Sequence, residues 1–211
     1  MSKVIVLLLS YLFGSIPWAL VIGLVFYKKD IRKEGSGNLG GTNAGRVLGK
    51  KAGVSVVALD VLKAFLSMVL AHYLAPGTEI YAGLACCVGH CFPIFAHFKG
   101  GKAVSTSIGF LLGISIFISH EYFFNLFFPV ICFFGILYLF RMVSLSSICT
   151  FIIATITSFI LYLNGRNDSE TVISLLILTI FITYRHSANI KRILNHTESH
   201  IKWMGKELWG K

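Results

Sequence analysis

Acidic side chains are scarce in this sequence, with nine Asp and Glu against nineteen Lys and Arg in 211 residues. No HExxH motif or carboxylate cluster of the kind that metal hydrolases use is present. The Cys-x-x-Cys pair of zinc sites and thiol oxidoreductases is also missing, and the five cysteines lie in apolar stretches. We therefore expect no metal and no other cofactor.

Hydrophobic residues are abundant instead. They make up 55% of the chain, and the mean hydropathy of +0.77 is too high for an ordinary soluble domain. The pattern predicts an all-α integral membrane protein, a bundle of about seven transmembrane helices in one domain (residues 1–211). Five spans with re-entrant segments are the alternative, because the fourth and last apolar segments are short. The segments cover residues 4–27, 53–75, 80–96, 103–119, 122–140, 145–163 and 171–184.

The basic residues indicate an orientation. Seven Lys and Arg lie between the first two segments and six follow the last, whereas Lys3 and Arg166 lie on the opposite side. Basic loops stay in the cytoplasm, so we expect the N-terminus outside, the C-terminus inside and the polar loops on the cytoplasmic face of the cell membrane. The charge favours anionic membrane lipid, and no soluble basic domain is present to bind nucleic acid. No obligate protein partner is expected. The tail (residues 201–209) carries two tryptophans and predicts an interfacial segment.

The first cytoplasmic loop carries an unusual polar stretch, residues 35–46, with five glycines. Glycine lets the backbone approach a ligand closely, so its N–H groups can converge on an anion with nearby hydroxyls and amides. Arg46 adds a planar charged group suited to phosphate oxygens. The stretch matches GxGxxG, but it does not follow a strand, which argues against a dinucleotide fold. The candidate anion ligands here are Ser36, Gly37, Asn38, Thr42, Asn43 and Arg46.

A second glycine-rich turn opens the fourth apolar segment. Gly100 and Gly101 stand between Lys99 and Lys102, so free N–H groups at a helix start would lie beside two ammonium groups. The turn lacks the first glycine of a Walker A loop, and Ala103 follows the lysine. We predict an anion site from His90, Lys99, Gly100, Gly101, Lys102 and Thr106. Helix-end packing is an equal alternative for His90.

Two later cytoplasmic stretches carry further candidates. Ser144 and Ser146 begin the sixth segment, where a simple helix cap is the alternative for Ser144. His186 and Asn189 follow the last segment and would share a helix face. Inside the second segment, Asp60 and Lys63 also share a face, which favours a structural ion pair over a substrate role.

Four polar stretches on one membrane face favour a single pocket for a doubly anionic, phosphate-bearing ligand. A transporter for an anionic metabolite is the rival class, but no internal repeat is evident. A membrane scaffold would leave the polar stretches unexplained. Because no local His–Asp relay is visible, acyl transfer here would depend on positioning and charge stabilisation and on an activated donor.

The four stretches together resemble a known family. GSGNLGGTNAGR at 35–46, GHCFPIFAHFKGGKAVST at 89–106, SLSS at 144–147 and RHSANIKR at 185–192 are similar, in order and spacing, to the PlsY family of membrane acyl-phosphate:glycerol-3-phosphate acyltransferases. The resemblance covers nearly the whole chain. It implies a bacterial enzyme that transfers a fatty acyl group from acyl phosphate to the sn-1 hydroxyl of glycerol 3-phosphate, the first step of phospholipid synthesis. The products would be lysophosphatidic acid and inorganic phosphate.

The resemblance also implies roles for individual residues. Glu198 matches a structurally important glutamate, and Ala103 stands where the family often has glycine. We expect direct attack of the hydroxyl on the acyl carbonyl, with a covalent Ser36 ester as the alternative. Whether His186 or a substrate phosphate oxygen accepts the proton stays open. The residues expected to catalyse are Ser36, Arg46, Lys102, His186 and Asn189.

Overall fold

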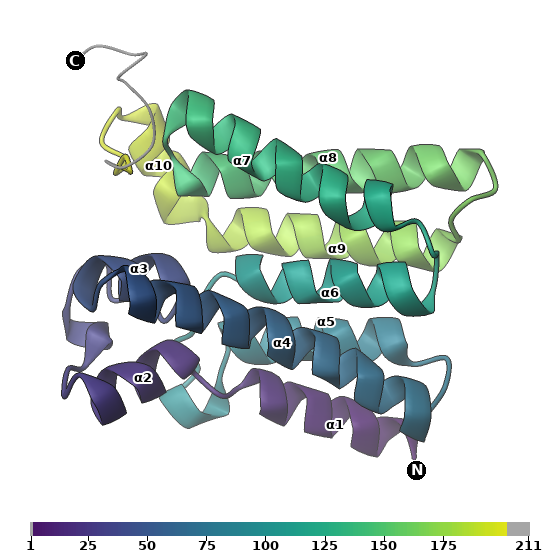
Figure 1. Ribbon diagram of the computed structural model, residues 1–211, viewed down its shortest axis with the longest axis horizontal. Coiled ribbons are helices and arrows are strands. Elements are labelled where there is room, and N and C mark those ends of the chain that lie inside the picture. The colour runs from purple at the N-terminus through teal and green to yellow at the C-terminus, as the bar shows by residue number, and fades with distance from the viewer. Residues whose placement is uncertain (1, 202–211) are drawn as a thin grey trace. The chain divides into compact units, whose positions relative to one another are not determined.

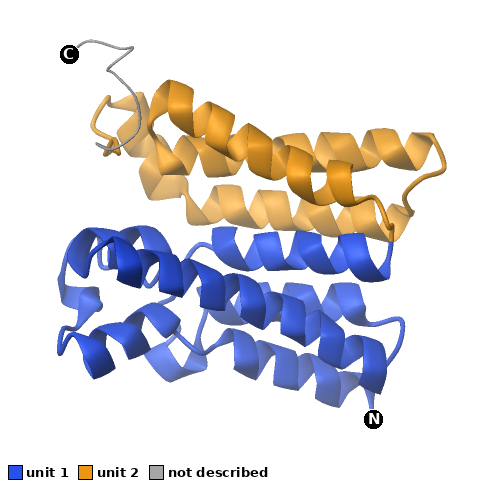
Figure 2. Cartoon of the chain, in the orientation of Figure 1, with its two compact units in different colours: residues 1–118 blue, residues 119–211 orange. Residues whose placement is uncertain are grey.

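The computed structural model describes residues 2–201, and each regular element in that part of the chain is a helix (Figure 1). The predicted all-α class is therefore confirmed. The chain divides into two compact units, Met1–Ile118 and Ser119–Lys211, coloured separately in Figure 2. The interfacial segment predicted for the tail lies, after Ile201, outside the described residues.

Unit 1 contains six α-helices and two short 3₁₀ turns. They are α1 (Lys3–Gly14), α2 (Trp18–Phe26), η1 (Ile31–Lys33), α3 (Gly41–Val47), α4 (Lys50–Leu74), α5 (Glu79–Cys91), η2 (Ile94–Ala96) and α6 (Val104–Phe117). The described part of unit 2, as far as Ile201, contains a π-helical turn and four α-helices. These are η3 (Phe123–Phe127), α7 (Phe128–Phe140), α8 (Val143–Leu163), α9 (Ser169–Arg185) and α10 (Ser187–Leu194).

Four segments of residues 2–201 are long and apolar enough to cross a bilayer as single helices, and two bent helix pairs raise that number to six. The single segments are Lys50–Leu74, Glu79–Ala96, Phe123–Phe140 and Val143–Leu163. The pairs are α1 with α2, bent by 43°, and α9 with α10, bent by 60°. α6 is apolar but has only 14 residues. The seven predicted segments thus correspond to helical stretches. The first, residues 4–27, is broken between α1 and α2, whereas the last, residues 171–184, lies within α9 and the bend into α10 follows it.

The break in the first apolar segment has a local cause. Pro17 precedes α2, and a proline has no N–H to donate and disfavours helical geometry in the residue before it. The chain therefore leaves the helical path at Ser15–Pro17, in the middle of an apolar segment. The carbonyl of Ile16, freed by the break, accepts a hydrogen bond from Lys63 Nζ at 3.1 Å.

Small residues let the helices of unit 1 approach closely. A Cβ added to Gly109 of α6 would overlap the carbonyl of Val61 in α4, and one added to Gly89 of α5 would overlap the carbonyl of Tyr11 in α1. Such packing is typical of membrane helices, which cannot rely on the hydrophobic effect to associate. In unit 2, Thr155 of α8 and Thr179 of α9 are joined by a hydrogen bond of 2.8 Å between their hydroxyls.

Large apolar side chains point outward from both units. Phe26 is 74% exposed, Tyr73 76%, Leu163 67% and Ile180 62%. On a soluble protein, exposed apolar surface on this scale would promote aggregation, whereas lipid covers it without cost. The exposure therefore agrees with the membrane environment that the composition predicts.

Candidate functional site

The first glycine-rich loop of unit 1 is organised by one buried amide. Asn43, 2% exposed in α3, accepts a hydrogen bond from the Ser36 N–H at 2.9 Å. Its Nδ2 donates to the carbonyls of Ile31 and Glu34 at 3.3 and 3.2 Å. Both ends of the amide are thus engaged within the protein. Asn43 positions the loop, and contact of Asn43 with substrate stays a prediction.

Gly35 is a position where only glycine fits without strain. Its φ is +60°, and an added Cβ would overlap Asn43 Oδ1. Gly37, at φ +68°, follows in the same loop. The run of glycines therefore serves the loop geometry, which holds the Ser36 N–H against Asn43.

The second glycine-rich turn packs on the ring of His90. The N–H of Gly101 donates to the His90 carbonyl at 3.0 Å, and a Cβ on Gly101 would overlap His90 Nε2. His90 is 5% exposed, at the end of α5. Ala103, next in the turn, has φ +62°, the left-handed region that glycine adopts most readily. This explains physically why glycine suits the position.

The His90 ring contacts a buried charged pair, Lys63 and Asp60. Lys63 Nζ contacts Asp60 Oδ1 at 2.9 Å, which confirms the predicted ion pair, and His90 Nδ1 at 3.1 Å. The other carboxylate oxygen of Asp60 accepts from the Ser105 hydroxyl at 3.3 Å. Lys63 and Asp60 are each 1% exposed. The sequence placed His90 in a binding motif but did not predict that it joins this pair.

The two glycine-rich stretches of unit 1 meet at one cavity of about 400 Å³. Gly37 comes from the first stretch and Lys99 from the second, so the structure brings together residues 62 positions apart in two predicted motifs. The sequence did not single out the remaining lining residues, Arg32, Ala96 and His97. His97 lies inside the second motif, and Arg32 lies in the basic run before the first, which were the available signals.

The charge of Arg32 is held in place by Asp30. The guanidinium donates to both carboxylate oxygens, at 2.9 and 2.8 Å, and Asp30 also accepts from the Arg32 N–H at 3.1 Å. These hydrogen bonds from Arg32 lower the pKa of Asp30 to about 2 and raise that of Arg32. Arg32 therefore presents a charge that Asp30 partly balances, while Lys99 adds a second cation to the cavity.

The remaining predicted residues of unit 1 differ in exposure. Ser36, Thr42 and Arg46 are exposed, whereas Asn38 and Lys102 are half-buried. Thr106 is buried, and its hydroxyl donates to the Ala103 carbonyl at 2.9 Å, inside the first turn of α6.

In unit 2, two of the predicted site residues, Ser144 and Asn189, contact Glu198. Its Oε1 accepts from the Ser144 hydroxyl at 2.8 Å and from Asn189 Nδ2 at 2.6 Å, and its Oε2 accepts from Arg192 Nε at 2.7 Å. We call Ser144, Asn189, Arg192 and Glu198 the Glu198 cluster. Burial raises the pKa of Glu198, but the hydrogen bonds and the Arg192 charge outweigh it and lower the pKa overall. Glu198 thus joins the starts of α8 and α10, as its implied structural role requires.

His186 and Ser146 are buried in unit 2. His186 is 3% exposed at the bend between α9 and α10, with Nδ1 2.9 Å from the Ile182 carbonyl. Ser146 donates to the Met142 carbonyl at 2.9 Å, within its own chain segment. Their roles in binding or catalysis stay predictions.

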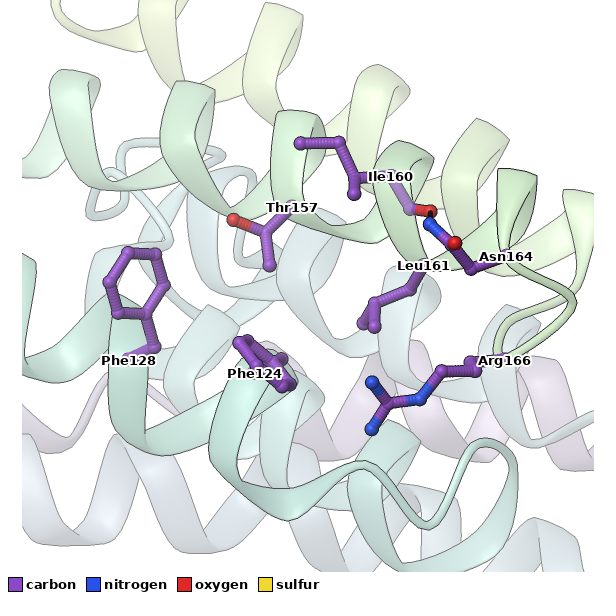
Figure 3. A pocket seen from close by; sticks show the side chains of 7 residues that line it. All are labelled: Phe124, Phe128, Thr157, Ile160, Leu161, Asn164 and Arg166. Carbon is purple, nitrogen blue, oxygen red and sulfur yellow. Dashed lines mark hydrogen bonds between the residues drawn. The ribbon is translucent and has the colours of Figure 1, made fainter.

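A second cavity, of about 450 Å³, contains none of the predicted residues (Figure 3). It lies in unit 2 near the loop between α8 and α9, and its lining is mostly apolar. Arg166 at its rim donates to both Glu121 carboxylate oxygens at 2.7 Å and lies over the Phe124 ring. The residues that line it are Phe124, Phe128, Thr157, Ile160, Leu161, Asn164 and Arg166.

Fold and cavities define an all-helical integral membrane protein with a glycine-lined, cationic cavity in unit 1. The glycerol-3-phosphate acyltransferase family matches residues 4–196. The chain is 46% identical over 201 residues to the glycerol-3-phosphate acyltransferase of Bacillus subtilis (strain 168), covering 95% of this chain and 98% of the relative. It is 44% identical over 203 residues to that of Geobacillus kaustophilus (strain HTA426), covering 96% and 98%.

Solved structures agree with these relatives. The crystal structure of PlsY (YgiH), an integral membrane glycerol 3-phosphate acyltransferase, in its glycerol 3-phosphate form has a TM-score of 0.84 and 33% identity over 96% of both chains. Its lysophosphatidic acid form has a TM-score of 0.81 over the same share. The chain therefore belongs to the glycerol-3-phosphate acyltransferase family, and it is an acyltransferase.

Proposed function

We propose that the acyl donor is an acyl phosphate and that the glycerol 3-phosphate hydroxyl attacks it directly. The single observation that carries the proposal is the cavity of unit 1, where the Gly37 loop meets Lys99, Arg32 and His97. Both substrates would carry phosphate, and backbone N–H groups together with guanidinium and ammonium groups are phosphate ligands. Arg46 and Lys102 supply two further cations to the substrates.

The chemistry requires little of the protein beyond positioning. The sn-1 oxygen forms a bond to the acyl carbonyl carbon, the bond from that carbon to the phosphate oxygen breaks, and the hydroxyl proton passes to a phosphate oxygen. Lysophosphatidic acid and inorganic phosphate leave. Because phosphate is already a good leaving group, stabilising the negative charge on the carbonyl oxygen and holding the substrates in line supply most of the acceleration.

A covalent Ser36 intermediate is disfavoured by what surrounds that serine. A serine nucleophile needs an adjacent base. Ser36 is exposed, and Asn43 Oδ1 accepts from its backbone N–H and not from its hydroxyl. We assign Ser36 as a hydrogen-bond donor that orients substrate, with His186 and Asn189 as further contributors.

The membrane arrangement belongs to the same proposal. We propose seven spans, counting the short α6, with the N-terminus outside and the C-terminus in the cytoplasm of a bacterial cell. The excess of Lys and Arg in the 28–51 and 185–211 stretches supports this orientation. The active site would then face the cytoplasm, and the acyl chain would enter from the lipid. The chain would act as one catalytic domain that requires no cofactor or protein partner.

The test measures formation of lysophosphatidic acid, the product of either donor, by purified protein given glycerol 3-phosphate with palmitoyl phosphate or with palmitoyl-CoA. Release of inorganic phosphate is measured in parallel for palmitoyl phosphate. With glycerol 3-phosphate present, we expect turnover with palmitoyl phosphate and none with palmitoyl-CoA. We expect the rate with palmitoyl phosphate to fall about a hundredfold in Arg46→Ala. Lys51→Ala, an exposed cation at the start of α4, is the matched control and should keep full activity. Turnover with palmitoyl-CoA but not with palmitoyl phosphate would refute the donor assignment. An acyl group found on Ser36 after rapid quenching would refute direct attack.

A further inference from the structure

The Lys63 ammonium lies among three acceptors that come from three different elements of unit 1. They are Asp60 Oδ1 of α4 at 2.9 Å, His90 Nδ1 of α5 at 3.1 Å and the Ile16 carbonyl between α1 and α2 at 3.1 Å. An ammonium group has three N–H donors and no acceptor, so each donor has one partner. The buried charge is thereby satisfied, and α4, α5 and the break between α1 and α2 are joined at one atom.

This arrangement determines the form of His90. His90 Nδ1 lies 3.1 Å from Lys63 Nζ, which can only donate, and 3.4 Å from Asp60 Oδ1, which is beyond the usual length of an N–H···O bond. The shorter contact makes Nδ1 an acceptor and assigns the ring proton to Nε2. Nε2 is also the atom over which Gly101 lies, since a Cβ there would overlap it. The same residue receives the Gly101 N–H on its backbone carbonyl. The Gly100–Gly101 turn thus rests on a histidine whose orientation and tautomer depend on Lys63.

A buried ion pair is a poor way to gain stability alone, because replacing it by apolar residues of similar volume is often neutral or stabilising. A role in geometry accounts for it better. We propose that Lys63 is a positioning residue for acyl transfer: through His90 it holds the Gly100–Gly101–Lys102 turn in the shape that binds the phosphate of glycerol 3-phosphate. The inference rests on the proposed function of that turn.

The first experiment separates the two substrates. Asp60→Asn/Lys63→Met removes both charges together and leaves no unpaired buried ion. We expect its KM for glycerol 3-phosphate to rise about tenfold or more, since displacement of a binding group by about 1 Å costs one to two orders of magnitude. The KM for the acyl donor should stay within about twofold. Ser115→Ala, a buried change on α6 whose hydroxyl bonds to its own helix, is the control and should change neither KM. Unchanged or equally raised KM values in the double variant would overturn the proposal.

The second measurement does not depend on activity. The ¹⁵N spectrum of histidine-labelled protein, assigned with His90→Asn, reports which ring nitrogen carries the proton. We expect the Nε2–H form for His90 in the wild type and a shift in Lys63→Met. An Nδ1–H ring in the wild type would overturn the proposal even if the variants fail to fold. Failure of the proposed donor would leave this tautomer result intact, so the two hypotheses are tested separately.

Discussion

The polar residues of the two units are used in different ways. In unit 1, cations and glycine backbone line a cavity, and Asn43 and the Lys63–His90 pair, which hold the two loops, are not among its lining residues. In unit 2, Ser144, Asn189 and Arg192 all donate to the single carboxylate of Glu198. The first arrangement leaves positive charge available for a ligand. The second uses its polar groups to hold two helices together.

The largest effect should come from disturbing the shape of the first loop. Gly35→Ala would place a Cβ on Asn43 Oδ1 at a φ of +60°. We expect about 1–2 kcal/mol of lost stability and, because the loop shape changes, about a hundredfold lower activity. Gly135→Ala in α7, where nothing lies within 4 Å, is the control and should change stability by no more than about 1 kcal/mol. Thermal melting in detergent and phosphate release measure both. Equal behaviour of the two variants would contradict the role given to Gly35.

A smaller effect should follow from removing a cavity cation without changing the loop. Lys99→Ala is expected to raise the KM for glycerol 3-phosphate about tenfold and to leave the melting temperature unchanged, because an exposed lysine contributes little to stability. The effect should shrink with added salt, which screens exposed charges. Lys50→Ala, also exposed, is the matched control. A fall in stability with an unchanged KM would place Lys99 in the same structural role as Glu198.

The smallest effect concerns pH and the Glu198 cluster. The pKa of Glu198 is lowered in the folded protein, so its charge stabilises the fold above the ordinary value of 4.5, and this contribution is lost as the pH falls through the lower folded pKa. At neutral pH the free energy of unfolding of the wild type should exceed that of Glu198→Gln by about 1–2 kcal/mol. The difference should vanish in acid. Glu170→Gln, exposed in α9, should show no such dependence. If the difference in stability between wild type and Glu198→Gln were the same at pH 7 and pH 3, the charge of Glu198 would not be its cause.

Local sequence was sufficient for the long apolar helices. Each predicted apolar segment coincides with a helical stretch, because a transmembrane helix is specified by composition over its own residues. The short α3 lies in a polar stretch that was predicted as a loop. The breaks were harder to predict. Pro17 gave a signal for the first, whereas the 60° bend between α9 and α10 at His186 follows no proline or glycine.

The candidate site was only partly predictable. Gly37 and Lys99 were recognised in their motifs, but Arg32 and His97 were not, since nothing in their neighbouring residues indicates that the two loops meet. Asn43 carried a binding-type signature, and the structure uses its amide to organise the loop.

The sequence by itself determined the class of protein, its long apolar helices and the four polar motifs, because each depends on residues close together in the chain. Only the tertiary structure decided which polar groups hold one another. Lys63 meets His90 across 27 positions, and Ser144 meets Glu198 across 54. The two partners of such a pair lie in different segments, so the contact depends on how the helices pack and cannot be read from either segment alone.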